Sequence, residues 1–332
     1  MDLAFVSACI VGFALFMYVL LDGFDLGVGI LFLVDTRAED RDAMMASVTP
    51  FWDGNETWLV FGGVALFGAF PVAYAILLPA LYLPAMVMLF ALVFRGVAFE
   101  YRIKSNRSRR WWDLSFSAGA AIAAFAQGIM LGAVIGGVEV GERAFAGGAF
   151  DWLSPFTLMC GFGLVAGYAL LGATWLVMKT EGPLQSRARR MAIRLVPVLA
   201  LFVVLVSLWT PLGHSVVAHR WFSLPNFIYL SPVPLLAASV LLGLWRGLAR
   251  GDERSPFLLT IGVFALSFLG LAISLYPYAV PYSVTIWEAV APAPSLEFLL
   301  VGIAAMLPIV VVYTGYNYWV FRGKVRKTTA YH

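Results

Sequence analysis

The sequence is poor in charged residues and in cysteine. Only 12% of its 332 residues are charged, whereas soluble domains average about 25%, so the composition excludes an ordinary soluble globular protein. The two cysteines, Cys9 and Cys160, each lie in an apolar run without CxxC spacing or polar neighbours. We interpret both as small packing residues rather than metal ligands or disulfide partners.

Histidine and nucleotide-binding motifs are equally scarce. The three histidines, His214, His219 and His332, all fall outside the middle of the apolar runs, so the chain offers no axial pair for a buried haem and no copper site. It also contains no P-loop, no GxSxG nucleophile elbow and no basic patch interleaved with aromatic residues. We therefore expect this chain to bind no haem, metal ion or nucleic acid by itself.

Long hydrophobic runs dominate what is present. The chain is 61% hydrophobic with a mean hydropathy of +0.87, and a helix needs about 20 mostly apolar residues to cross a bilayer. Asp2 stands where a signal peptide would be basic, so we expect the first run to be a retained span. The sequence predicts one all-α integral membrane domain, residues 1–332, with nine spans near 4–32, 54–73, 77–100, 113–136, 155–178, 193–213, 228–248, 257–279 and 296–320.

The boundary between the second and third spans is the weakest of these predictions. Residues 52–100 are almost continuously apolar, and Pro71, Pro79 and Pro84 indicate either a hairpin or kinks. The distribution of basic residues favours nine spans, because 19 of the 22 Lys and Arg then lie on one side of the membrane. These are Arg37, Arg41, Arg102, Lys104, Arg107, Arg109, Arg110, Lys179, Arg187, Arg189, Arg190, Arg194, Arg246, Arg250, Arg254, Arg322, Lys324, Arg326 and Lys327.

This asymmetry predicts the orientation. Only Arg143 and Arg220 fall on the opposite side, and Arg95 lies within the third span. Because Lys and Arg accumulate in cytoplasmic connections, the N-terminus is expected outside the cell membrane and the C-terminus in the cytoplasm.

Two carboxylates interrupt the first span. The stretch "LLDGFDLGVGILF", residues 20–32, places Asp22 and Asp25 three residues apart, and therefore on one helix face. A charged residue at the centre of a span costs roughly 2.5 to 3.5 kcal/mol even on insertion scales, so such residues are often functional. Gly23 and Gly27 form a small-xxx-small pair that would let another helix pack closely against this one.

A second acidic pair opens the second span, in "FWDGNETWL", residues 51–59. Asp53 and Glu56 again share a face, and we expect Asp53 to cap the helix with Glu56 completing a capping box. Trp52 precedes this pair, and Asn55 lies between its two members. Since consecutive helices are usually neighbours, the four carboxylates of the two spans are predicted to converge on the cytoplasmic side, either as a proton pathway or as structural groups.

Further polar residues within the spans carry open alternatives. Arg95 in "FRGVAFEYR" either extends its head to the lipid headgroups or pairs with these carboxylates, and Glu100 lies in the same motif. Gln127 and Asn317 are interpreted as hydrogen-bonding residues between helices.

Several motifs together resemble one known family. "DGFDLGVGIL", "WDGNETWL", "FRGVAFEYR", "YPYAVPYSVTIWEA" and "PIVVVYTGYNYWVFRGKV" are similar to sequences of subunit II of the cytochrome bd-type quinol oxidases. The resemblance implies a nine-helix subunit of the bacterial cytoplasmic membrane that serves as a scaffold for a haem-bearing subunit I. That partner is expected to hold the quinol site, two haems b and one haem d.

The complex implied by this resemblance oxidises quinol, reduces dioxygen to water and generates a proton motive force. The proton-route aspartates of the family match Asp25 and Asp53, and Trp52 matches the tryptophan of the second motif. The resemblance also allows a bound quinone or lipid and a small single-helix accessory subunit. Glu288 stands where the family has an aspartate in "TIWEAVAPAPSLEF", and "APAPS" replaces a more serine-rich segment. The outer connections after the fourth and sixth spans are also shorter than in the longest members, so the resemblance is to compact members such as the cyanide-insensitive type.

A stand-alone proton-coupled transporter is the alternative function. The same midspan acids could serve transport. However, the sequence lacks paired broken helices in corresponding halves, which would be typical of a transporter site.

Overall fold

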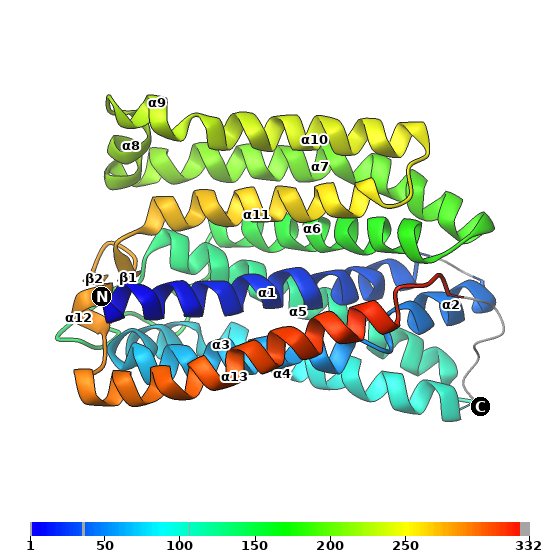
Figure 1. Ribbon diagram of the computed structural model, residues 1–332, viewed down its shortest axis with the longest axis horizontal. Helices are drawn as coiled ribbons and strands as arrows, with labels where there is room; N and C mark the ends of the chain where they lie inside the picture. The colour runs from blue at the N-terminus through cyan, green and yellow to red at the C-terminus, as the bar shows by residue number, and fades with distance from the viewer. Residues whose placement is uncertain (1, 35–36, 106, 326–332) are drawn as a thin grey trace.

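Long helices running side by side make up most of the molecule (Figure 1). The computed structural model describes residues 2–34, 37–105 and 107–325, so Arg326, Lys327 and His332 lie outside the described residues. The long helices are α1 Leu3–Phe32, α3 Trp52–Ala69, α4 Pro71–Lys104, α5 Arg109–Gly136, α6 Pro155–Lys179, α7 Gly182–Gly213, α10 Pro232–Arg250, α11 Ser255–Leu275 and α13 Ala293–Val320.

Short elements fill the connections between these helices. They are α2 Ala38–Val48, α8 Ser215–Phe222, α9 Asn226–Leu230, α12 Ile286–Ala289 and an antiparallel hairpin of β1 Tyr278–Val280 and β2 Val284–Thr285. The hairpin, α8, α9 and α12 lie at the end of the bundle where α1 begins, and α2 lies at the other end (Figure 1). Apolar windows did not reveal α2, α8, α12 or the hairpin as separate elements, because they are short or sit among polar residues, whereas the predicted span 228–248 includes most of α9.

Eight segments of the described chain are long and apolar enough to cross a membrane, and Asn226–Arg250 counts as one of them. Helix α3 is not among the eight. Its first turns carry Asp53, Asn55 and Glu56, which lower its mean hydropathy although its second half is apolar. The chain is therefore a multi-pass membrane protein, and its described residues are helical apart from one small hairpin and the connecting turns.

The structure corrects the predicted boundary between the second and third spans. Phe70 leaves the helical conformation, with φ −130° and ψ 62°, and Pro71 starts the next helix. The second predicted span, 54–73, therefore ends at Ala69, and the third starts at Pro71 rather than at 77. Pro79 and Pro84 lie inside the continuous α4, so Pro71 marks the hairpin and the other two prolines do not break the helix.

Two further boundaries differ from the apolar windows. Helix α7 begins at Gly182 rather than near 193, because the basic segment that precedes the apolar run is also helical. Helix α11 ends at Leu275 rather than at 279, because the chain turns into β1 after Pro277. Hydropathy locates the apolar part of a helix and not its polar ends.

Close packing of α1 against α6 depends on glycines. A Cβ at Gly27 would overlap the carbonyl oxygen of Tyr168, and a Cβ at Gly172 would overlap the backbone of Gly27. A Cβ at Gly23 would come within 2.7 Å of the Tyr168 ring. The prediction that Gly23 and Gly27 admit a neighbouring helix is confirmed, and that helix is α6.

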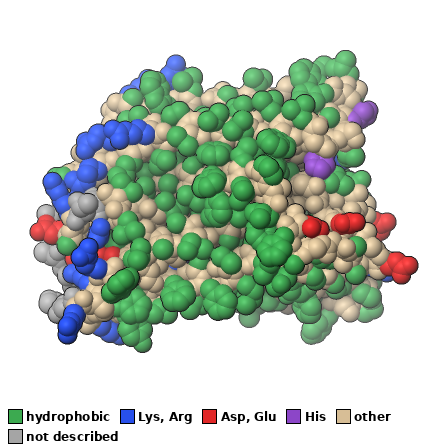
Figure 2. Space-filling model, turned by 180° about the vertical axis from the view of Figure 1, so that it is seen from behind, with side chains coloured by type: hydrophobic (Ala, Val, Ile, Leu, Met, Phe, Trp, Pro, Cys, Tyr) green, Lys and Arg blue, Asp and Glu red, His purple; other side chains and the backbone are tan. Residues whose placement is uncertain are grey.

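Basic side chains gather at one end of the bundle, whereas acidic side chains occur at both ends. Lys and Arg gather at one end of the face in Figure 2, whereas the histidines lie towards the other end together with Asp and Glu side chains. Because Figure 2 is turned by 180° about the vertical axis from Figure 1, this basic end is the end at which α2 lies.

Candidate functional site: a buried carboxylate and arginine cluster

Arg95 on α4 joins two of the predicted carboxylates. Its Nη1 donates a hydrogen bond of 2.7 Å to Oδ1 of Asp22 on α1, and its Nη2 donates to Glu56 on α3. The side chains of Arg95 and Asp22 are 0% and 1% exposed, whereas that of Glu56 is 28% exposed. Of the two alternatives for Arg95, pairing with the carboxylates is therefore confirmed, and Glu56 is the member of this group that reaches the surface.

Asp25 is held by a second set of hydrogen bonds. Asn55 on α3 donates through Nδ2 to Oδ2 of Asp25 at 2.6 Å and to the carbonyl of Leu21 at 3.1 Å. Tyr318 on α13 donates its hydroxyl to Oδ1 of Asn55 at 2.9 Å. Oδ1 of Asp25 and Oδ2 of Asp22 are buried and have no hydrogen-bond partner among the described residues. The cluster thus retains two buried acceptors that can receive a proton or a water.

Asp53 does not join this cluster, which corrects the predicted convergence of four carboxylates. Helix α3 begins at Trp52 with Phe51 as its N-cap, and no side chain caps it. The predicted capping box of Asp53 and Glu56 is therefore wrong, because the helix starts one residue before Asp53 rather than after it. Asp53 is exposed on the first turn of α3, and three carboxylates, not four, lie together.

Two other predicted site residues lie beside the cluster or away from it. The Trp52 ring stacks on that of Phe99, with ring centroids 4.9 Å apart and planes 9° apart, and so links α3 to α4 one turn from Arg95. Glu100 pairs with Lys104 at 3.3 Å, and both side chains are more than half exposed. Glu100 thus contributes to the surface charge of α4 rather than to the buried cluster.

Buried tyrosines form the part of the site that the sequence analysis missed. Gln127 on α5 donates to the hydroxyl of Tyr18 at 2.7 Å and accepts from the hydroxyl of Tyr168 at 2.8 Å. Gln127 is thus confirmed as a hydrogen-bonding residue between helices. Asn317 on α13 instead donates to the carbonyl of Pro50 at 2.9 Å, in the turn between α2 and α3, so it joins a helix to a turn rather than two helices. The available signal was the spacing of Tyr18, which lies four residues before Asp22 and on the same helix face.

A separate ionic network fastens α2 to the bundle. Asp113 on α5 accepts from Arg102 at 2.5 Å and from Arg41 at 2.9 Å, and Asp42 accepts from Arg102 at 2.7 Å. Arg102 and Asp113 are nearly fully buried, at 3% and 6% exposure. The network holds α2 across the ends of α4 and α5 and thereby covers the end of the bundle nearest the cluster.

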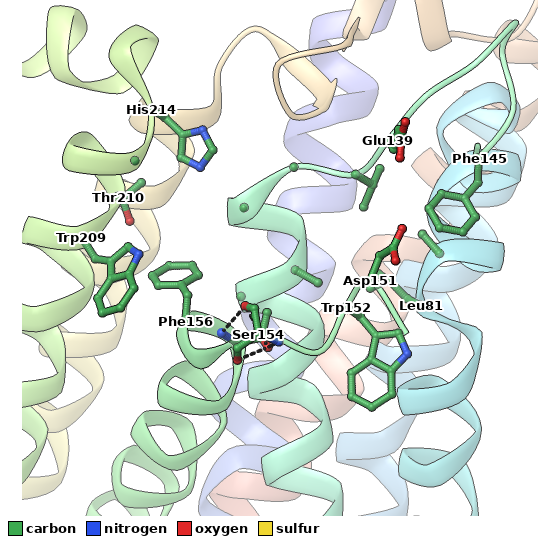
Figure 3. A pocket seen from close by; sticks show the side chains of 18 residues that line it. Leu81, Glu139, Phe145, Asp151, Trp152, Ser154, Phe156, Trp209, Thr210 and His214 are labelled. Atoms are coloured by element: carbon green, nitrogen blue, oxygen red, sulfur yellow. Dashed lines mark hydrogen bonds between the residues drawn. The ribbon is translucent and has the colours of Figure 1, made fainter. Parts of the chain in front are cut away.

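A cavity of about 390 Å³ lies at the opposite end of the molecule, between α4, α5, α6 and α7 (Figure 3). Glu139 and Asp151 line one side, and Trp209, Phe156 and His214 line the other. Burial lowers the pKa of His214 and thereby favours the neutral imidazole. The His214 ring also stacks on the ring of Tyr282. The cavity shares no lining residue with the carboxylate cluster.

Comparison with known proteins decides the family. The family model described as "Cytochrome bd terminal oxidase subunit II" matches residues 3–321. The chain belongs to this family. It is 30% identical over an alignment of 365 residues to "Cytochrome bd-I ubiquinol oxidase subunit 2" of Escherichia coli (strain K12), covering 98% of this chain and 96% of the relative.

More distant relatives agree with this assignment. "Cytochrome bd ubiquinol oxidase subunit 2" of Bacillus subtilis (strain 168) is 28% identical over 312 residues, covering 92% of this chain and 91% of the relative. The solved structure of bd oxidase from Geobacillus thermodenitrificans contains a chain that matches with a TM-score of 0.80 and 19% identity, over 97% of this chain and 99% of that one. This match shows the same fold.

The chain is thus a subunit of a bd-type oxidase, a haem-containing oxidoreductase complex of the respiratory chain, and its family implies a subunit I partner. Family membership favours the oxidase over the stand-alone transporter. His214 and His219 are the histidines of the described residues, and both lie outside the candidate spans. They do not fit the axial ligation of a haem buried in the membrane.

Proposed function

We propose that this chain is subunit II of a bd-type quinol oxidase in the bacterial cytoplasmic membrane, where it supplies part of the cytoplasmic proton route and a scaffold for subunit I. In this proposal the partner carries the quinol site, the two haems b and the haem d. Asp25 carries the proposal, since it is a fully buried carboxylate with one oxygen held by Asn55 and the other oxygen unpartnered. Ionisable groups within membrane helices commonly mark proton pathways.

The proposed topology has nine spans, with the N-terminus outside and the C-terminus in the cytoplasm. Helix α3, the second long helix in the chain, is the span that this proposal adds to the eight candidate segments. Its 18 residues rise about 27 Å, close to the hydrocarbon thickness of about 30 Å. The concentration of Lys and Arg at the α2 end supports a cytoplasmic position for that end.

Protons would reach Asp25 from the α3 surface near this cytoplasmic end. Asp53 is exposed on the first turn of α3, and Glu56 lies one turn further into the membrane at the edge of the buried cluster. Asn55, on the same helix, contacts Asp25 directly. We assign proton uptake to Asp53 and Glu56 and proton storage to Asp25, while Asp22 remains paired with Arg95.

The substrates of the complex would be a quinol and dioxygen. The relatives from Escherichia coli and Bacillus subtilis carry "ubiquinol" in their names, which makes a ubiquinol-type donor at subunit I our first choice. The cavity of about 390 Å³ at the outer end is large enough for a small ligand, and we place the bound quinone or lipid of this subunit there. A single-helix accessory subunit would add to the outside of the helix bundle.

The proton route is tested with Asp25→Asn in the intact complex. Oxygen consumption is measured with a soluble quinol analogue, and the haem spectrum is recorded on the same sample. We expect a loss of turnover of tenfold or more with full haem content, because a buried amide cannot take up a proton. Asp53→Asn is expected to lower turnover less, since water at the surface can replace an exposed carboxylate.

Glu100→Gln is the matched control, because it removes an exposed carboxylate of α4 outside the cluster. Its turnover should equal that of the wild type. Wild-type turnover in Asp25→Asn would refute the relay. Loss of haem d from the same sample would instead assign Asp25 a structural role at the contact with subunit I.

A further inference from the structure

Tyr18, Gln127 and Tyr168 form a second buried hydrogen-bonded group, which begins one helical turn from Asp22. Tyr18 is 4% exposed, Gln127 8% and Tyr168 0%. The three side chains come from α1, α5 and α6, so the group joins three helices at their common core. Neither the charge pairing of Arg95 nor the hydrogen bonds of Asn55 involve these three residues.

The hydrogen bonds of this group leave one hydroxyl hydrogen without an acceptor. Tyr168 donates its hydrogen to Oε1 of Gln127, and Tyr18 accepts a hydrogen from Nε2 of Gln127. The hydroxyl of Tyr18 contacts the NH2 group of Gln127, and an amide nitrogen does not accept hydrogen bonds, so Tyr18 cannot donate to it. The hydroxyl hydrogen of Tyr18 therefore requires a further acceptor, because buried polar groups are nearly always hydrogen-bonded.

An unused acceptor lies on the same face of α1. Oδ2 of Asp22 is buried and has no partner among the described residues, whereas Oδ1 accepts from Arg95. Tyr18 and Asp22 are four residues apart, which places their side chains one above the other on the helix. The Nε1 group of Trp58 is also buried without a partner, and Trp58 packs in one apolar group with Tyr18.

No hydrogen bond among the described residues joins the Tyr18 hydroxyl, the Trp58 indole N–H and Oδ2 of Asp22 to one another, although Trp58 packs with Tyr18 and Tyr18 lies one helical turn from Asp22. A buried water typically occupies such a place, because it makes two to four hydrogen bonds to groups that would otherwise be unsatisfied. The hydroxyl of Tyr18 and the indole N–H of Trp58 would donate to this water, and the water would donate to Oδ2 of Asp22.

We propose that Tyr18 is a positioning residue for Asp22, that it donates to Oδ2 of Asp22 through one buried water shared with Trp58, and that Gln127 and Tyr168 orient its hydroxyl. Asp22 then receives hydrogen bonds on both oxygens and stays a carboxylate beside Arg95. Asp25, which has one free oxygen, becomes the group that changes its protonation. This last consequence rests on the proposed proton route.

The experiment is infrared spectroscopy of the intact complex in membranes. The carboxylate stretching band of Asp22 is identified by its loss in Asp22→Asn. Tyr18→Phe and Gln127→Leu are both expected to shift this band, because each removes the donor or its orientation. Thr174→Val is the matched control: it removes another buried hydroxyl of α6, whose hydrogen bonds stay within that helix, and it should leave the band in place.

An unshifted band in Tyr18→Phe, or an equal shift in Thr174→Val, would overturn the proposal. Cryo-electron microscopy of the wild-type complex needs no variant. It should show water density between Tyr18, Trp58 and Asp22 at a resolution where other buried waters are seen, and its absence there would equally overturn the proposal. Neither of these readouts measures turnover. A failure of the Tyr18 proposal can therefore be told apart from a failure of the proton route, which would appear as wild-type turnover in Asp25→Asn.

Discussion

Removing the positive charge of Arg95 should be among the most damaging single changes in this chain. Arg95→Gln deletes the cation and leaves a shorter, neutral polar side chain. It leaves Asp22, which is 1% exposed, without a counter-charge and leaves Glu56 without its partner at the edge of the cluster. The direct effect is an uncompensated carboxylate among α1, α3 and α4.

The magnitude follows from burial. Removing one partner of a buried ion pair costs roughly 3 to 5 kcal/mol, because the remaining charge stays desolvated. Asp22 meets this condition fully. Glu56, at 28% exposure, can turn towards water or headgroups and adds little. We therefore expect a loss of about 3 kcal/mol or more in the free energy of unfolding.

The assay is equilibrium unfolding of the purified complex in mixed micelles with increasing SDS, followed by far-ultraviolet circular dichroism. Arg110→Gln is the matched control, because Arg110 is exposed on the first turn of α5, and it should change stability by less than about 0.5 kcal/mol.

The double variant Asp22→Asn/Arg95→Gln tests the electrostatic explanation. It buries no lone charge at this position and should recover most of the loss, as coupled sites do in a double-mutant cycle. An effect of Arg95→Gln within about 1 kcal/mol of the control would refute the reasoning. A double variant no more stable than Arg95→Gln would show that packing, and not charge, causes the loss.

Three further predictions concern packing, pH and hydrogen bonding. Gly27→Ala should force α1 and α6 apart and destabilise the complex by roughly 1 to 3 kcal/mol or more in the same SDS titration. Gly63→Ala is its control and should be neutral or slightly stabilising, because nothing lies within 4 Å of the added Cβ. Hydrogen bonds, above all the one from Lys324, lower the pKa of Glu253. The stabilising contribution of Glu253 is therefore present above the ordinary carboxyl pKa and is lost as the pH falls through the lowered value. Hydrogen exchange near Lys324 should be faster in Glu253→Gln than in the wild type at neutral pH, and equal to it in acid. Asn55→Leu should leave two partners unsatisfied, Oδ2 of Asp25 and the hydroxyl of Tyr318, at roughly 1 to 3 kcal/mol for each that stays buried. The carbonyl of Leu21 keeps its hydrogen bond within α1, and a loss below about 1 kcal/mol in the same titration would show that water replaces the amide.

The sequence was sufficient to predict the class of protein and the approximate location of its helices. Hydropathy is a local property that accumulates over about 20 residues, so apolar windows identify spans without knowledge of their neighbours. The same locality explains the errors at the ends. Phe70 and Pro71 separate α3 from α4 inside an unbroken apolar run, and the polar start of α7 lies outside the apolar window.

The sequence also identified which residues are costly in a membrane. Asp22, Asp25 and Arg95 stand out because charge in an apolar run requires compensation, and Gly23 and Gly27 indicated a close helix contact. These predictions depend on residue type and on the spacing along one helix. They required no knowledge of how each helix is rotated about its own axis.

That rotation is what only the tertiary structure decided. Asp53 has the same spacing from Glu56 as Asp22 has from Asp25, but α3 begins at Trp52 and presents Asp53 outward and Asn55 inward. Tyr318, 263 residues after Asn55, completes the hydrogen bonds around Asp25. Partners so distant in the chain meet because of how the helices pack, and that packing depends on all of the contacts at once rather than on any local pattern.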